Sequence, residues 1–176
     1  LGGRVKTLHP AIQGGILARR SHEVDQQEVK DYGLSLIDLV IVDLYPFEAT
    51  VASGASEEDI IEKIDIGGIS LIRGSAKNYE DVVIIPSQAD YATLQSILEH
   101  RGAKTTLEER RHFARRAFAV SSGYDSAIFR WFDGDEATAL RLTADQAQPL
   151  RYGENPHQKG IFFGDLSRYF TQLHGK

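Results

Sequence analysis

Two short and almost uninterrupted apolar runs constrain the fold of this chain more than any other feature. The first is LIDLVIVDL at residues 36–44, and the second is DVVIIP at residues 81–86. Both are short and rich in β-branched residues, and strands that are apolar on both faces are typical of parallel sheets covered by helices. We therefore expect two buried parallel strands in an α/β domain.

Helical patterns occupy most of the remaining sequence. Residues 21–32 predict a solvated helix capped by Ser21 and stopped by Gly33, and residues 56–64 predict a helix that begins at the capping residue Ser56. A helix over 68–77 follows the glycine pair at 67–68, and two longer helices are expected in 88–102 and 106–132. The glycine pairs at 2–3 and 14–15 indicate loops or close backbone approach.

The last of these helices has a regular apolar pattern. One broad buried face is expected from residues that recur at spacings of three, four and six, namely Leu107, Phe113, Ala117, Val120, Tyr124 and Ile128.

The chain divides near residue 135. The helical pattern breaks into DGDEATALRLTADQAQP at 133–149, and LRYGENPHQKGIFF then starts a new pattern. We expect one domain at 1–135, a linker at 136–149 and the start of a second domain at 150–176. The chain begins with Leu and stops inside a helix-like pattern, so we also expect a fragment of a longer protein.

Composition excludes several classes of protein. A net charge of −5 argues against a surface that coats nucleic acid, although it allows a local basic pocket for an anionic ligand. The absence of cysteine excludes disulfides, thiolate nucleophiles and cysteine-bound zinc, and fits a cytoplasmic location. The six histidines have no metal-ligand spacing, and no apolar run approaches the roughly 20 residues of a membrane helix. We expect neither metal, nucleic acid nor membrane as a partner.

The stretch GRVKT at residues 3–7 is the first candidate for binding. On a strand, Arg4 and Lys6 would face the same side because side chains alternate, and two cations beside glycines can bind an anion. The other interpretation is a solvated basic loop.

DLYPF at residues 43–47 directly follows the first strand. Ligands in open α/β sheets bind outside the carboxyl ends of the strands, where Tyr45 could present its hydroxyl as a donor or proton carrier. The alternative is a tyrosine whose ring covers the core.

The third candidate stretch is IDIGGISLIRGSAKN at residues 64–78. Gly67 and Gly68 allow close approach of a ligand to the N–H groups of a starting helix, and Asp65 could accept a hydrogen bond from that ligand. Lys77 lies three helical turns further on and could transfer a proton. The alternative is an aspartate that caps the helix and a lysine that complements its dipole.

Four motifs follow one another along the chain: GRVKTLHP (3–10), LYPF (44–47), IDIGG with LIR and SAKN (64–78), and RYGENPHQ (151–158). Together they resemble the bifunctional purine-biosynthesis family that combines AICAR formyltransferase with IMP cyclohydrolase. The motifs span almost the whole chain, and GRVKTLHP and RYGENPHQ are long and unusual.

The resemblance implies a fold and two activities. Residues 1–135 would form a methylglyoxal-synthase-like α/β domain, with a mainly parallel sheet flanked by helices. This domain would close the ring of 5-formamidoimidazole-4-carboxamide ribonucleotide to IMP with loss of water. Residues from Leu150 would begin a second α/β domain, the formyltransferase, at its first strand.

The resemblance also implies site residues. The catalytic set would be Lys6, Tyr45, Asp65 and Lys77, with Lys77 in proton transfer. Nucleotide contacts would come from Arg4, Val5, Thr7, Val42, Asp43, Ile66, Gly67 and Gly68, and Arg151 and Tyr152 would belong to the AICAR pocket of the second domain.

The same resemblance indicates partners. The cyclohydrolase needs no cofactor, whereas 10-formyltetrahydrofolate is the co-substrate of the formyltransferase. We expect a purine nucleotide as substrate and a homodimer in the parent protein. An alternative is a regulatory domain of the same fold that binds nucleotide effectors, although RYGENPHQ does not fit it.

The chain departs from the family pattern in two motifs. Asp43 stands where asparagine is usual, and a carboxylate cannot donate as an amide does unless it is protonated. Gln13 replaces a histidine, for which we expect a mild effect. The family's phosphate-binding loops before GRVKT, and its formyl-transfer Lys–His pair, lie outside these 176 residues. We therefore expect no formyl transfer by this stretch alone, and weakened nucleotide binding.

Overall fold

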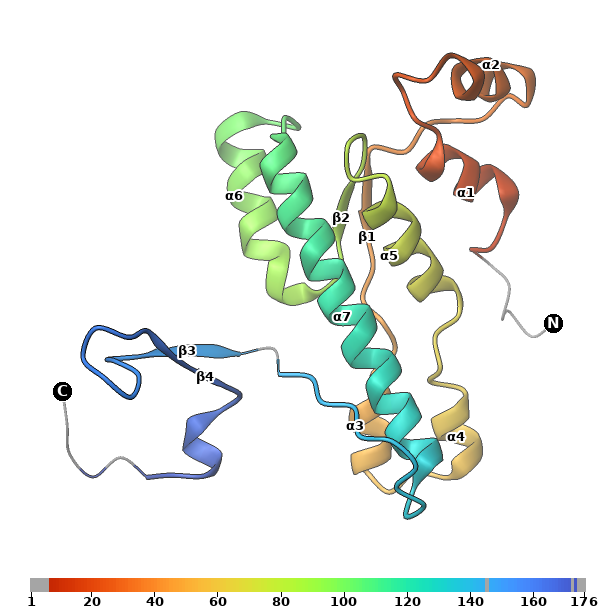
Figure 1. Ribbon diagram of the computed structural model, residues 1–176. Coiled ribbons are helices and arrows are strands. Elements are labelled where there is room, and N and C mark those ends of the chain that lie inside the picture. Colours follow the sequence, from red (N-terminus) through yellow and green to blue (C-terminus); the bar gives the residue numbers. More distant parts are fainter. Residues whose placement is uncertain (1–6, 145, 172, 174–176) are drawn as a thin grey trace. The chain divides into compact units, whose positions relative to one another are not determined.

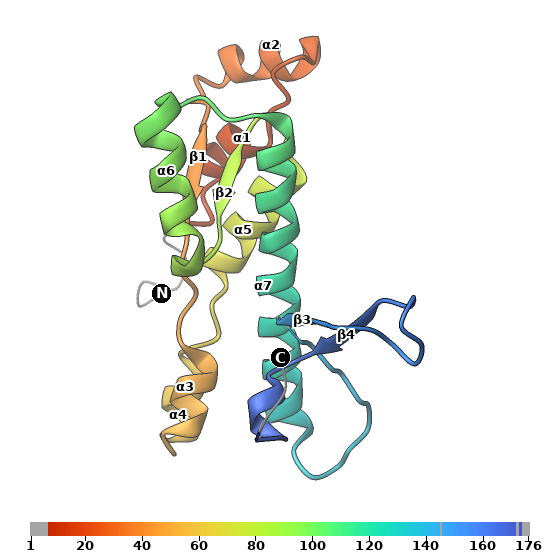
Figure 2. The same ribbon diagram turned by 90° about the vertical axis from the view of Figure 1, so that its left-hand side faces the viewer.

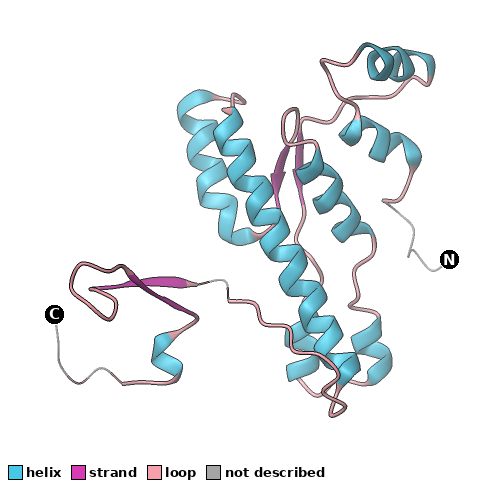
Figure 3. Cartoon of the chain, in the orientation of Figure 1, coloured by secondary structure: helices cyan, strands magenta, loops and turns pink. Residues whose placement is uncertain are grey.

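The computed structural model describes residues 7–144, 146–171 and 173 (Figure 1). The chain divides into two compact units, residues 1–135 and residues 136–176. The first is a mixed α/β unit in which helices predominate, and the second contains a small two-stranded sheet (Figure 3). In the described residues no helix is both long and apolar enough to cross a membrane.

A parallel pair of strands lies at the centre of unit 1. Strand β1 (Leu39–Ile41) pairs with β2 (Val83–Ile85) in parallel, with Val40 opposite Ile84. The helices of this unit are α1 (Pro10–Leu17), α2 (Glu23–Asp31), α3 (Phe47–Ala52), α4 (Glu57–Ile61), α5 (Gly67–Lys77), α6 (Tyr91–Arg101) and α7 (Leu107–Asp133), with a short 3-10 turn at Gln88–Asp90. The prediction of two parallel strands is confirmed.

The burial of the two strands differs from the prediction. All three residues of β2 are buried, as expected. In β1 only Val40 is buried, while Leu39 and Ile41 remain 38% and 47% exposed. These two side chains share one face because side chains alternate along a strand. Burial on both faces is therefore wrong for β1, since the described elements cover only one of its faces.

The main core lies where α1, α5, α6 and α7 pack around β2. Its fully buried side chains include Ile16, Ile72, Ile84, Ile85 and Phe113. A second, smaller cluster joins Phe47, Ile60 and Ala127. The long α7 runs from the strand pair to α3 and α4 in both views, and so connects the two clusters (Figures 1 and 2).

Helix α1 was not predicted as a helix. Its glycine pair at 14–15 suggested a loop or a close approach, and the second interpretation is correct. A Cβ on Gly15 would lie 2.2 Å from the carbonyl oxygen of Ser35, and the N–H of Ile37 donates to the carbonyl of Gly15 at 3.0 Å. The glycine lets α1 lie directly on the backbone of residues 35–37.

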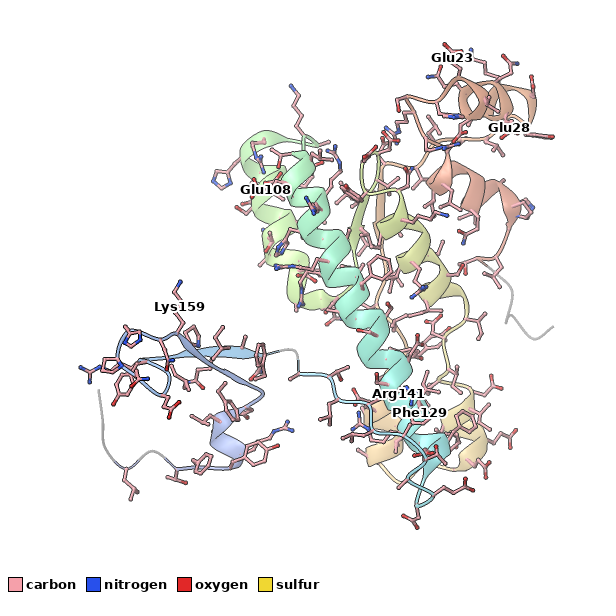
Figure 4. All side chains as sticks on the ribbon, in the orientation of Figure 1. Glu23, Glu28, Glu108, Phe129, Arg141 and Lys159 are labelled. Carbon is pink, nitrogen blue, oxygen red and sulfur yellow. The ribbon has the colours of Figure 1, made fainter. Side chains whose placement is uncertain are left out.

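The boundaries of α2 differ slightly from the prediction. The N-cap is His22 rather than Ser21, and it makes no side-chain capping bond. Gly33 ends the segment with a φ of 60°, a left-handed conformation that glycine adopts without strain. Glu23 and Glu28 lie on the exposed surface of α2 (Figure 4). The solvated character of this helix is confirmed.

Helices α4, α5, α6 and α7 agree well with the sequence. Ser56 caps α4 by accepting from the N–H of Asp59 at 3.1 Å, although the helix ends at Ile61 rather than residue 64. Thr106 and Glu109 form a reciprocal capping box at the start of α7. The predicted apolar face of α7 holds at Phe113 and Ala117, but Leu107 is 51% exposed because it lies in the first turn.

Unit 2 contains an antiparallel hairpin. Strand β3 (Ala147–Leu150) pairs with β4 (Gly160–Phe163), and a short 3-10 turn follows at Leu166–Arg168. We predicted that a strand would start at Leu150, but β3 ends there, and RYGENPHQ forms the connection. The N–H of Gly153 donates to the carbonyl of Gln158 at 2.8 Å, which closes this connection on itself.

Candidate functional site

The N-terminus of α5 is shaped by an aspartate and two glycines. The N–H of Gly68 donates to Oδ1 of Asp65 at 2.6 Å, so this half-buried carboxylate caps the helix. A carboxylate accepts several hydrogen bonds, so capping leaves capacity for a ligand N–H. Ile66 lies between Asp65 and the two glycines in the sequence, and its side chain is 56% exposed. The capping role considered for Asp65 is therefore confirmed, and it is compatible with a hydrogen bond from a ligand to the same carboxylate.

The GRVKTLHP motif meets the IDIGG motif at the start of α5. A Cβ built on Gly67 would lie 2.1 Å from Oγ1 of Thr7, which means that the threonine occupies the space of a side chain. Gln13 also reaches α5, where its Nε2 donates to Oγ of Ser70 at 3.2 Å. Residues 7–13 therefore lie along α5. Arg4, Val5 and Lys6 fall outside the described residues.

Tyr45 approaches the same region from the segment after β1. Its ring lies 5.8 Å from Nζ of Lys63, in a cation–π arrangement, and the side chain is 55% exposed. The alternative role for Tyr45, a ring that covers the core, is wrong for this half-exposed side chain. Phe47 does that instead, at 2% exposure.

Tyr124 of α7 joins the segments that carry Asp65 and Tyr45. Its hydroxyl donates to the carbonyl of Lys63 and accepts from the N–H of Asp65 at 2.8 Å. Its ring meets that of Phe47 edge to face, with centroids 6.1 Å apart. Burial raises the pKa of Tyr124. Sequence reasoning assigned Tyr124 to the core alone.

Asp43 has a tyrosine partner that the sequence did not reveal. The hydroxyl of Tyr91, at the start of α6, donates to Oδ2 of Asp43 at 2.5 Å. This bond raises the pKa of Tyr91, because the hydroxyl can donate to the carboxylate only while it is protonated, and ionisation would also place two negative charges together. Val42 is held beside them by a bond from its N–H to the carbonyl of Ile85 at 3.0 Å. Here the carboxylate of Asp43 acts as a hydrogen-bond acceptor.

Lys77 lies at the other end of α5. It is the last residue of that helix and its side chain is exposed. Asp65 precedes it by twelve residues, which corresponds to about 18 Å at roughly 1.5 Å per residue. Thr7, Tyr45 and Asp65 thus gather near one end of α5, and a ligand that also contacts Lys77 must extend along the helix.

Arg151 and Tyr152 belong to unit 2. Both are exposed in the connection between β3 and β4. The carbonyl oxygen of Tyr152 would lie 2.7 Å from a Cβ on Gly160, so that glycine permits the tight closure of the hairpin. Among the described residues of either unit, no group of three or more His, Cys, Asp or Glu side chains could hold a metal ion.

Comparison with known proteins identifies relatives along the whole chain. It is 65% identical over 176 residues to the bifunctional purine biosynthesis protein PurH of Bacteroides thetaiotaomicron, covering 100% of this chain and 35% of that protein. It is 51% identical over 168 residues to PurH of Rhodospirillum rubrum, covering 93% of this chain and 32% of that protein. The chain therefore spans about a third of the length of the curated relatives that it matches.

A solved structure and a family profile agree with these relatives. The crystal structure of ForH matches with a TM-score of 0.60 and 38% identity, over 75% of this chain and 68% of that one. The profile of the AICARFT/IMPCHase bienzyme family matches residues 75–176. Because this match covers more than half of the sequence, the chain belongs to the AICARFT/IMPCHase bienzyme family.

Proposed function

We propose that unit 1 carries IMP cyclohydrolase activity on a methylglyoxal-synthase-like fold. The substrate is 5-formamidoimidazole-4-carboxamide ribonucleotide, whose carboxamide nitrogen attacks the formyl carbon. The resulting carbinolamine loses water to give IMP. Membership of the bienzyme family and the parallel β1–β2 pair between helices support this proposal.

The observation that carries the proposal is the meeting of three motifs at one end of α5. Thr7, Tyr45 and Asp65 come from separate parts of the sequence, and each contacts the segment 63–67 or belongs to it. A helix N-terminus, a carboxylate and a half-exposed phenol together suit a polar base with an amide group.

The remaining residues have proposed roles. Asp65, Ile66, Gly67 and Gly68 hold the base and its amide, and Thr7, with Arg4, Val5 and Lys6, contacts the nucleotide. Val42 and Asp43 form the floor at the end of β1. Tyr45 and Lys6 handle the protons that leave the amide nitrogen and depart with the hydroxyl, and Lys77 joins this proton transfer from the far end of α5, along which the bound substrate extends. No metal or organic cofactor takes part in this scheme.

Unit 2 begins the other half of the proposed bienzyme. Arg151 and Tyr152 contribute to an AICAR pocket, and 10-formyltetrahydrofolate donates the formyl group there. The complete protein is a cytoplasmic homodimer that acts on purine nucleotides. These proposals rest on the family, since this chain spans about a third of its relatives.

Replacement of Lys77 tests the mechanism. In the complete gene product, Lys77→Leu is expected to lower kcat for ring closure by about 100-fold or more, because a positioned proton-transfer group contributes on that scale. The control is Lys104→Leu, which removes another exposed lysine, in the connection between α6 and α7. Ring closure is measured as IMP formed from the formamido nucleotide.

The outcomes separate the alternatives. Wild-type rates in Lys77→Leu would exclude the proton-transfer role of Lys77 while leaving the activity in place. Nucleotide binding without any IMP formation by the unaltered protein would favour the effector-binding regulatory domain instead.

A further inference from the structure

Two backbone groups between α4 and α5 need partners that neither helix provides. The carbonyl of Lys63 and the N–H of Asp65 lie in the turn that joins the end of α4 to the start of α5. Unpaired backbone groups are costly when water is excluded, so such turns depend on side chains to satisfy them. Tyr124 satisfies both groups with one hydroxyl.

The same side chain also fixes the segment after β1. Phe47 packs edge to face against Tyr124, and against Trp131 with ring centroids 6.0 Å apart. These two aromatic residues of α7 are seven positions apart, so they lie on one face of the helix. Phe47 is 2% exposed, and its N–H donates to the carbonyl of Tyr45 at 2.8 Å. The position of Tyr45 is therefore tied to the same helix face as Asp65.

Lys63 completes this connection. Its carbonyl accepts from Tyr124, while its amine lies over the ring of Tyr45 at 5.8 Å from the centroid. Tyr45 and Asp65 come from segments separated by α3 and α4, yet both are linked to Tyr124 by one or two contacts. A shift of the Tyr124 side chain would move both segments, because its hydroxyl holds the turn and its ring contacts Phe47.

We propose that Tyr124 is a positioning residue that holds the Lys63–Asp65 turn and the Tyr45–Phe47 segment in register for the substrate. This inference rests on the proposed cyclohydrolase site and adds a residue to its support. Tyr124 need not touch the substrate. A tyrosine hydroxyl ordinarily has a pKa of about 10 and burial raises that of Tyr124, so the hydroxyl is protonated at neutral pH and can donate to Lys63.

Tyr124→Phe isolates the hydroxyl from the ring. The variant keeps the edge-to-face contact with Phe47 but leaves Lys63 and Asp65 without their shared partner. In the complete gene product we expect the KM for the formamido nucleotide to rise about tenfold, the scale of two lost hydrogen bonds. The kcat is expected to fall less, since Tyr124 takes no part in proton transfer. The control is Tyr79→Phe, which removes the hydroxyl of another half-buried tyrosine that packs on the main core.

A second measurement does not depend on turnover. Without nucleotide, amide hydrogen exchange at Asp65 is expected to accelerate in Tyr124→Phe and to remain unchanged in Tyr79→Phe. Unchanged exchange at Asp65 would overturn the proposal, as would faster exchange with unaltered KM and kcat. If the unaltered protein makes no IMP, the proposed function fails. The role of Tyr124 can still be decided in that case, by comparing hydrogen exchange at Asp65 and IMP binding, measured by NMR, between the unaltered protein and Tyr124→Phe.

Discussion

At the residue scale, the start of α5 depends on the absence of a side chain. Thr7 fills the space next to Gly67, and the carboxylate of Asp65 lies against Gly68. Both glycines are therefore required for close packing. Each lets another part of the proposed site approach the N–H groups of the helix.

Gly67→Ala is expected to separate the GRVKTLHP motif from the start of α5. The new Cβ would lie 2.1 Å from Oγ1 of Thr7, so residues near 7 or the helix start must move. We expect a loss of about 1–3 kcal/mol in the free energy of unfolding, as for other overpacked sites, and at least a tenfold rise in the nucleotide KM. Urea unfolding and steady-state kinetics measure the two effects.

Two variants make this prediction specific. Gly123→Ala adds the same methyl group inside α7, where nothing lies within 4 Å of the new Cβ, and should stabilise the helix slightly. Thr7→Ala combined with Gly67→Ala removes Oγ1, so unfolding stability should recover in part. A Gly67→Ala variant with unchanged stability and KM would show that Thr7 does not lie against α5.

The sequence shows the candidate site residues unevenly. The local positions of Asp65, Gly67 and Tyr45 follow from local rules, because caps, glycine pairs and strand ends are visible in a short window, whereas their roles in a site stay predictions that rest on the family resemblance. Tyr91 and Tyr124 were not identified as site residues, since their partners Asp43 and Asp65 lie 48 and 59 residues away. The position of a tyrosine in a helical pattern indicates whether its ring is buried, but it does not indicate which group its hydroxyl contacts.

At the element scale, the long and strongly patterned segments were predicted well. The helices α5, α6 and α7 and the pairing of β1 with β2 agree with the sequence. The short helices α1 and α3 were missed because tertiary contacts override their local signals. Gly14 and Gly15 disfavour an isolated helix, whereas contact with residues 35–37 stabilises α1.

The connection between α1 and α2 predicts an acid-sensitive contribution to stability. Asp25 accepts two bonds from the guanidinium of Arg19, at 2.9 and 2.8 Å, and one from its N–H at 2.9 Å. These bonds hold the pKa of Asp25 well below its usual range. The contribution is therefore present above the ordinary carboxyl pKa of about 3.9, and is lost as the pH falls toward the folded value.

Urea unfolding at about pH 6 and about pH 3 measures this contribution, since the two values lie on either side of the ordinary carboxyl pKa. Asp25→Asn should lower stability at the higher pH and flatten the pH dependence. Asp135→Asn removes the same charge beyond the end of α7 and should leave the dependence unchanged. An equal slope in the unaltered protein and Asp25→Asn would contradict a depressed pKa.

At the scale of the whole molecule, the two units differ in how they are stabilised. Unit 1 has a main core around β2 and a second cluster around Phe47, joined by α7. Unit 2 has a two-stranded hairpin, and such hairpins are marginally stable by themselves. The units divide after Asp135, close to the place where the helical pattern of the sequence breaks and few apolar residues follow a helical or strand period.

This organisation predicts where a protease cuts first. Residues 136–144 and 146 contain no helix or strand, and Leu140 and Leu142 are 82% and 83% exposed. Proteases need an extended and accessible backbone, so chymotrypsin at low ratio should cleave after these leucines before it cuts within residues 7–133. Phe132 is a built-in control, because it is 63% exposed but held within α7. Mass spectrometry of the early products identifies the cut, and Leu140→Ser with Leu142→Ser should slow it. A first cut between residues 7 and 133 would mean that unit 1 opens more readily than the segment that follows it.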